Sequence, residues 1–206
     1  MPTYKLIYFD MRGMGEVIRL LFALADVPYE DKRLSFEEWA LFKSQTPFGQ
    51  LPLLEIDGKV LSQSQTIYRY LANEFGYAGK DAFEKATVDS IADAQKDVFQ
   101  HLLAYFLASE GTGKGDPETI FEERAKPATD KHFPILVKLL KESGSGFFVK
   151  SGLTWVDLVI SEELSTYRNL KPLILKDFPE LEEHIDRVRA VPQIQAWHKV
   201  NPPSHH

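Results

Sequence analysis

The 206-residue sequence contains no cysteine, so disulfides, thiolate metal sites and a nucleophilic thiol of the protein's own are excluded. No apolar run approaches the ~20 residues that a membrane helix requires. The first residues show no basic segment followed by an apolar stretch, so no secretory signal is predicted. These absences favour a reducing, cytoplasmic setting and a chain that does not insert into a membrane.

Charge and histidine spacing argue against two further classes of protein. The net charge of −6 disfavours nonspecific attraction to nucleic acid or to anionic membranes. Four histidines stand alone along predicted helices, without the spacing of a zinc site: His101, His132, His184 and His198. We therefore predict neither nucleic-acid binding nor a metal site.

Strand and helix patterns alternate through the first 77 residues. Strands are predicted at residues 5–9, 29–34, 53–56 and 59–61. Helices are predicted after the glycine turn of residues 13–15, over residues 36–43, and from Ser64 onward. The order β-α-β-α-β-β-α predicts a thioredoxin-like domain over residues 1–77.

Three local signals mark the ends of these elements. Ser35 followed by Glu38 matches a capping box at a helix start. Asp57-Gly58 is a strong hairpin-turn signal. Ser64 is predicted to be the N-cap of the third helix.

The second part of the sequence carries only helical patterns after Phe83. Apolar residues at helical spacing are Phe99, Leu102, Leu103, Phe106, Ile135, Leu136, Leu139 and Leu140. Thr154 and Asp157 form another capping-box pattern, and prolines 172, 179 and 192 mark shorter helices. We predict an all-helical domain over residues 83–206, joined to the first domain by a linker near residues 77–82.

One set of residues resembles the glutathione transferase family. Tyr8 lies on the first strand, Trp39 and Lys43 on the second helix, and Gln63-Ser64 at the start of the third. Before the third strand stands Phe48-Gly49-Gln50-Leu51-Pro52. The stretch YKLIYFDMRGMGEVIRLLFALADVPYED is similar to the sigma class, and the resemblance covers essentially the whole chain.

The resemblance implies that glutathione binds as a co-substrate along residues Gly49, Gln50, Leu51 and Pro52. In the family the peptide bond before this proline is cis, which leaves the backbone N–H and C=O of Leu51 as an open edge. The cysteinyl backbone of glutathione is expected to pair with this edge as a short extra strand.

The same resemblance implies partners for the charged ends of glutathione. Gln63 and Ser64 are expected to hold the γ-glutamyl carboxylate at the start of a helix. Trp39 and Lys43 are expected to meet the glycyl carboxylate. Asp97 matches a family aspartate that crosses a dimer interface to the γ-glutamyl ammonium, so a homodimer is expected.

Tyr8 is the expected catalytic residue. A free thiol has a pKa of about 8.5, so little thiolate is present at neutral pH, and a phenol that donates a hydrogen bond to sulfur favours the anion. The activated glutathione is expected to attack hydrophobic electrophiles, a detoxifying reaction, while Arg12 holds the turn or adds positive charge. The electrophile pocket is predicted from adjacency between the two domains, with Phe9, Met14, Val159 and Val200.

Three alternatives accompany this hypothesis. Some sigma-class enzymes isomerise prostaglandin H to prostaglandin D, but they have arginine where Met14 stands and tryptophan where Ala104 stands. Sigma members in nematodes can bind haem and other bulky hydrophobic ligands, so a non-catalytic carrier is a second alternative. A structural protein, like the lens crystallins of cephalopods, fits less well because Tyr8 and the glutathione-site residues are intact.

Overall fold

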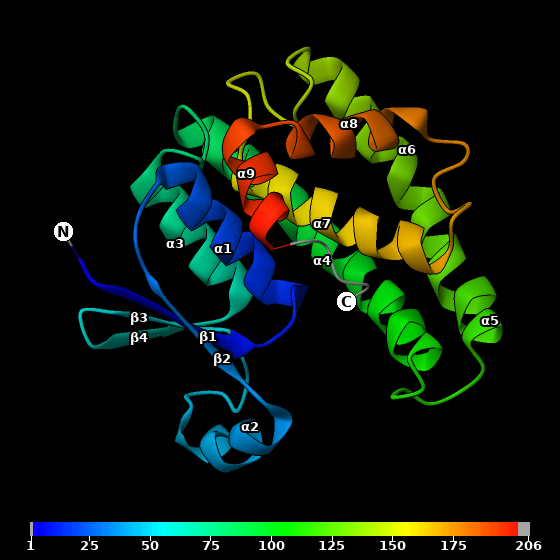
Figure 1. The fold of residues 1–206 in the computed structure, drawn as a ribbon. Helices are drawn as coiled ribbons and strands as arrows, with labels where there is room; N and C mark the ends of the chain where they lie inside the picture. The colour runs from blue at the N-terminus through cyan, green and yellow to red at the C-terminus, as the bar shows by residue number, and fades with distance from the viewer. Residues whose placement is uncertain (1, 202–206) are drawn as a thin grey trace. The chain divides into compact units, whose positions relative to one another are not determined.

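The computed structural model describes residues 2–201, and Figure 1 shows the chain as a ribbon. Its contacts form two compact units, Met1–Ala78 with Val191–His206 and Gly79–Ala190. This division differs from the predicted range 83–206, because the last helix, α9 (Pro192–Val200), belongs to the first unit. α9 packs against α1 (Gly13–Ala25), where Trp197 Nε1 donates to Glu16 Oε1 at 2.8 Å.

The first unit is built on a four-stranded sheet with helices on both faces (Figure 1). Its strands are β1 (Tyr4–Phe9), β2 (Glu30–Leu34), β3 (Leu53–Ile56) and β4 (Lys59–Ser62). Their order is β2-β1-β3-β4, with β1 parallel to β2, and with β3 antiparallel to β1 and to β4. The predicted thioredoxin-like arrangement is confirmed.

Side chains of β1 alternate between the two faces of the sheet. The ring of Tyr4 contacts Phe22 of α1 and Phe75 of α3 (Ser64–Phe75). Ile7 faces the other way, into an apolar cluster with Leu34, Leu53 and, from α2 (Phe36–Phe42), Trp39 and Phe42. Tyr8 shares the parity of Tyr4, so its side chain lies on the α1 face.

Local signals placed two of the three element ends correctly. The capping box is present, with Glu38 N donating to Ser35 Oγ at 3.2 Å and Ser35 N donating to Glu38 Oε2 at 2.8 Å. Asp57 and Gly58 have φ values of 48° and 80°, as a primed hairpin turn requires.

The prediction that Ser64 caps α3 is wrong. Gln63 holds the N-cap position at φ 73°, ψ 116°, and Ser64 is the first helical residue. Gln63 has a positive φ and ends the preceding segment, so the helix begins at Ser64. A serine that caps a helix must stand one position before its first residue, which is where Gln63 stands.

The second unit is helical. Its elements are α4 (Ala82–Ser109), α5 (Pro117–Ile120), the π-helical turn η2 (Phe121–Ala125), α6 (Lys126–Ser143), α7 (Trp155–Leu170) and α8 (Pro179–Arg189). Among the described residues of this unit, strand pairing is limited to an isolated bridge between Val149 and Gly152. The predicted all-helical character is therefore confirmed.

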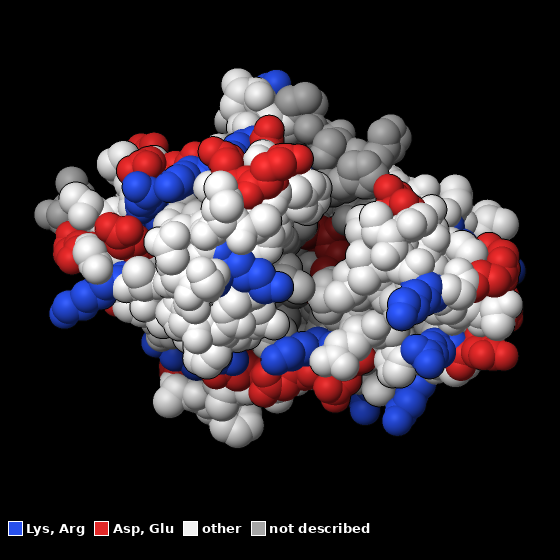
Figure 2. All heavy atoms as spheres, turned by 90° about the horizontal axis from the view of Figure 1, so that it is seen from below, with Lys and Arg blue, Asp and Glu red and all other residues white. Residues whose placement is uncertain are grey.

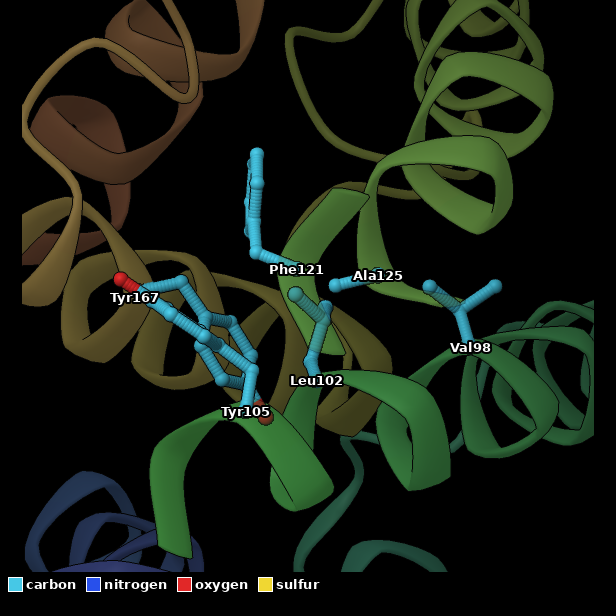
Figure 3. Close-up of a cluster of buried hydrophobic side chains, with 6 residues drawn as sticks. All are labelled: Val98, Leu102, Tyr105, Phe121, Ala125 and Tyr167. Atoms are coloured by element: carbon cyan, nitrogen blue, oxygen red, sulfur yellow. The ribbon is translucent and has the colours of Figure 1, made fainter. Parts of the chain in front are cut away.

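One apolar cluster joins α4, η2 and α7 within this unit. Figure 3 shows its members, Val98, Leu102, Tyr105, Phe121, Ala125 and Tyr167.

The predicted apolar stripe on α6 is only half right, because Leu136 is buried whereas Ile135 is 46% exposed. Successive helical residues are about 100° apart, so Ile135 lies off the face that Leu136 and Leu140 share.

On one face of the molecule, the charged side chains do not separate by sign. On the face shown in Figure 2, acidic and basic groups lie interspersed. Within residues 2–201, no helix combines the length and the apolar character needed to cross a membrane.

A polar chain of two buried residues and the half-buried Glu163 connects α4, α6 and α7. Gln95, which is fully buried, donates from Nε2 to Glu163 Oε2 at 2.6 Å, and its Oε1 lies 2.9 Å from His132 Nε2. Burial raises the pKa of Glu163 from 4.5 to about 8, although the bond from Gln95 lowers it in part. The carboxyl group is therefore protonated at neutral pH.

This protonation makes stability depend on pH. Between pH 4.5 and about 8 the folded chain holds a proton on Glu163 that the unfolded chain has released, so the free energy of unfolding falls as pH rises through this window. Glu163→Gln, which keeps an acceptor for Gln95, is expected to raise the urea midpoint at the alkaline end of the window and to change it little at the acid end.

Glu183→Gln, at an exposed position of α8, is the matched control and is expected to show no such pH dependence. Equal slopes of stability against pH for the parent protein and Glu163→Gln would contradict the assignment.

Candidate active site

Tyr8 lies in a close-packed turn between β1 and α1. Its hydroxyl accepts a hydrogen bond from the backbone N–H of Met14 at 3.1 Å, and the residue is only 7% exposed. A Cβ at Gly15 would stand 2.4 Å from the Tyr8 ring, so only glycine permits this approach. Met14 is held from its other side by Tyr68 of α3, whose hydroxyl donates to the Met14 carbonyl at 2.6 Å.

The Tyr8 hydroxyl is a hydrogen-bond donor at neutral pH. Burial raises the pKa of Tyr8 above its ordinary value, and the Met14 N–H and the positive charge of Arg19 lower it only in part. Because the oxygen accepts from Met14, its own hydrogen remains available for a second partner. The group can therefore stabilise an anion by donation, and it is poorly suited to act as a base.

Arg19 holds the turn that carries Tyr8. Its guanidinium donates to the carbonyls of Met11 at 2.7 Å and Phe9 at 3.3 Å, and it pairs with Asp31 at 3.0 Å. Arg12, which we expected to hold the turn or to add positive charge, lies with its guanidinium 3.8 Å from Glu16. The signal for Arg19 was an arginine inside the apolar run Val17 to Leu21, because a buried charge needs several partners.

A second edge of the site lies before β3. The Leu51–Pro52 peptide bond is cis, as the resemblance implied. Leu51 packs against the cluster of Ile7, Leu34 and Leu53. Among the described residues, no hydrogen bond engages the backbone N–H or carbonyl of Leu51. The N–H can therefore donate to the backbone of an extended ligand, and the carbonyl can accept from it.

Gln50 and Gln63 meet beside the start of α3. Gln63 Nε2 donates to Gln50 Oε1 at 3.0 Å, and both side chains are exposed. Gln63 at φ 73° occupies a sparsely populated region for a residue with a side chain, a feature that clusters at functional sites. Ser64, at the first helical position, adds its hydroxyl to the free N–H groups of the helix start.

Trp39 and Lys43 are placed differently from each other. Trp39 is partly buried, with its ring 6.0 Å from that of Phe9. Lys43 is exposed at the end of α2. A Cβ at Gly49 would lie 3.6 Å from the Lys43 side chain, so the lysine and the Gly49 loop are neighbours.

The residues predicted for the electrophile pocket and the dimer fall into two groups. Phe9 and Met14 are partly exposed beside Tyr8, with the rings of Phe9 and Tyr8 5.5 Å apart. Val200, at the end of α9, is 76% exposed. In the second unit, Asp97 is exposed on α4 and Val159 is 3% exposed on α7. Within the first unit, Phe9 and Met14 therefore lie beside Tyr8.

Two family models match the chain. The model described as glutathione S-transferase, N-terminal domain, matches residues 4–73, and the one described as glutathione S-transferase, C-terminal domain, matches residues 96–201. Glutathione S-transferase 1 of Ascaris suum is 49% identical over 197 residues, which are 96% of each chain.

Solved structures agree with this match over the whole chain. The glutathione S-transferase from Ascaris lumbricoides has a TM-score of 0.94 and 47% identity, covering 99% of this chain and 100% of that one. A Nu-class enzyme from Haemonchus contortus has a TM-score of 0.90 and 45% identity, covering 100% of each chain. Na-GST-3 from Necator americanus, described as monomeric, has a TM-score of 0.93 and 43% identity, covering 99% of this chain and 100% of that one. The chain therefore belongs to the glutathione S-transferase family and is a transferase.

Proposed function

We propose that this protein conjugates glutathione to hydrophobic electrophiles, with the Tyr8 hydroxyl stabilising the glutathione thiolate. The observation that carries the proposal is the protonated, oriented phenol of Tyr8, which accepts from Met14 N–H and keeps a hydrogen to donate. With an aryl halide, the thiolate sulfur forms a bond to the ring carbon and halide leaves with the bonding electrons. The thiol proton is released to solvent.

Glutathione is expected to lie between Tyr8 and the two exposed polar edges. The open backbone of Leu51 pairs with the cysteinyl unit, beside the cis bond to Pro52. Gln63 and Ser64 bind the γ-glutamyl carboxylate, because the start of α3 offers free N–H groups and positive dipole. Gln50, which accepts from Gln63, holds that amide in place.

The glycyl end of glutathione is assigned to α2. Lys43 is exposed and lies near Gly49, so its ammonium is available to a carboxylate. Trp39 contributes an indole N–H beside Phe9. The electrophile is assigned to the side of Tyr8 where Phe9 and Met14 lie.

The assembly and class are also proposals. Asp97 is exposed on α4, as a residue that reaches the γ-glutamyl ammonium of a second copy must be. The sequence resemblance favours the sigma class and a homodimer. The similar structure described as Nu-class favours a different class, and the one described as monomeric favours a monomer. Light scattering coupled to gel filtration measures the mass, and a mass of 23.5 kDa would contradict the dimer.

A conjugation assay tests the enzymatic proposal directly. Glutathione with a generic aryl halide is expected to give turnover that depends on both substrates. Near-silence in this assay together with tight haem binding would favour the carrier. Formation of prostaglandin D from prostaglandin H would show the isomerase activity.

Removing one hydroxyl tests the glutathione site. Ser64→Ala is expected to raise the Kd for glutathione about tenfold, because a hydrogen bond to a charged group contributes about 1.5–3 kcal/mol. The value of kcat at saturating glutathione is expected to stay nearly constant. Isothermal titration calorimetry measures the Kd.

Thr66→Ala is the matched control, since this exposed hydroxyl lies in the same helical turn of α3. Equal effects of the two substitutions on the Kd would remove Ser64 from the site.

A further inference from the structure

Two oppositely charged side chains of α1 are buried in the first unit. Glu16 is 3% exposed and Arg19 is 1% exposed, and Arg19 NH1 lies 3.5 Å from Glu16 Oε2. Burying charges is unfavourable unless they are paired and fully hydrogen-bonded. The positions of these two groups therefore depend closely on the remaining partners of each one.

The partners of Arg19 belong to the turn that carries Tyr8. The guanidinium donates to the carbonyls of Phe9 and Met11, which stand on either side of Asp10. Its carbon lies 6.0 Å from the centre of the Tyr8 ring. A shift of Arg19 would therefore release the segment between β1 and Met14, whose N–H donates to the Tyr8 hydroxyl.

The partners of Glu16 come from the far end of the chain. Trp197 of α9 donates its indole N–H to Glu16 Oε1 at 2.8 Å, across 181 sequence positions. The next residue, His198, lies 3.4 Å from Arg12 NH2, and the same Arg12 nitrogen lies 3.8 Å from Glu16 Oε1. Two adjacent side chains of α9 thus contact charged groups next to the Tyr8 turn: Trp197 contacts Glu16, and His198 contacts Arg12.

We propose that α9 positions the Tyr8 hydroxyl, with Trp197 as the positioning residue. The indole N–H holds one oxygen of Glu16, which leaves the other oxygen for Arg19. Without this donor the carboxylate turns toward its two arginines, and Arg19 loses alignment with the carbonyls of the turn. The proposal rests on the thiolate role given to Tyr8, and it assigns no substrate contact to α9.

Trp197→Phe keeps an aromatic ring and removes only the donor. We expect the pKa of glutathione bound to this variant, read from the ultraviolet absorbance of the thiolate, to rise by about half a unit to one unit. We expect kcat with an aryl halide to fall about tenfold, since small displacements of catalytic groups are costly. KM for glutathione is expected to change by less than about twofold, because ground-state binding is not altered.

Gln195→Ala, at an exposed position of the same helix, is the matched control and is expected to leave the thiol pKa unchanged. Glu16→Leu, which removes the acceptor of the Trp197 hydrogen bond, is the second variant. Adding Trp197→Phe to it is expected to shift the thiol pKa no further, because both substitutions act through that one hydrogen bond. Circular dichroism verifies that each variant is folded. If Trp197→Phe does not fold, His198→Ala tests the same helix and is expected to give a smaller rise of the same sign.

The outcomes separate this inference from the proposed function. An unchanged thiol pKa in folded Trp197→Phe, together with a large loss in Tyr8→Phe, would overturn the positioning role alone. An unchanged thiol pKa in both variants would instead overturn the role of Tyr8. A fall in kcat with additive pKa shifts in the double variant would also contradict the shared path through Glu16.

Discussion

Replacing Tyr8 by phenylalanine is expected to lower kcat for aryl-halide conjugation by about 100-fold while glutathione still binds. The change removes one donor to a developing anion and keeps the ring that packs on Gly15. Loss of a single donor to an anion in a buried site commonly costs about 10²–10³ in kcat. A phenol is protonated at neutral pH, and burial raises the pKa of Tyr8 further above its ordinary value, so the donor is present throughout the neutral range.

Two measurements separate this effect from a change in binding. The pKa of the bound thiol is expected to rise toward the value of a free thiol, about 8.5, when the phenol is absent. The Kd for glutathione, measured by calorimetry, is expected to change little, because the two carboxylates of glutathione are bound elsewhere. Turnover of Tyr8→Phe equal to that of the parent protein would exclude the phenol from catalysis.

Tyr4→Phe is the matched control for this experiment. Tyr4 is 7% exposed, like Tyr8, and stands on the same strand and the same face. Its ring packs on Phe22 and Phe75, away from the turn. It is expected to keep the thiol pKa and the turnover of the parent protein.

Replacing Asp157 by alanine is expected to destabilise the second unit by about 3–5 kcal/mol. Asp157 is fully buried, and its carboxylate accepts from Thr154 N and Thr154 Oγ1, both at 2.8 Å. It also accepts from Phe148 N at 3.0 Å and lies 3.0 Å from His184 Nε2. The substitution leaves these buried groups without an acceptor. The free energy of unfolding is therefore expected to fall by more than it does when an exposed helix cap is removed.

Asp81→Ala provides the comparison, because Asp81 is the exposed N-cap of α4 and accepts from Phe83 N and Glu84 N. Loss of an exposed cap costs about 1 kcal/mol. Urea unfolding of both variants is followed by circular dichroism. The difference between their losses of stability measures how much the burial of Asp157 contributes beyond capping. Equal losses in the two variants would show that Asp157 acts only as a cap.

Some structural features follow from neighbours in the sequence. The boxes of Ser35 with Glu38 and of Thr154 with Asp157 were predicted and are present, because each joins residues three positions apart. Asp57-Gly58 likewise forms the predicted turn. Ser64 failed as a cap because the conformation of Gln63 depends on its place at the end of β4.

Other features of the site could not be predicted in this way. Arg19 was recognisable as an unusual charge in an apolar helix, but its partners were not. The carbonyls of Phe9 and Met11 reach it because α1 folds back beside β1, and Asp31 reaches it because β2 pairs with β1. Tyr68 reaches the Met14 carbonyl from α3, across 54 positions. No sequence spacing encodes these contacts, since they depend on how α1 and α3 pack.

Short-range chemistry along the chain was enough to predict the order of strands and helices and the split between a mixed and a helical part. The residues of a glutathione site were implied by the resemblance to a known family. Folding in three dimensions was needed to orient the Tyr8 phenol, to bury Glu16 with Arg19, and to bring α9 back to α1. Periodicity and capping depend on residues within a few positions of each other. Burial and buried charge pairing depend on segments that meet only in the folded chain.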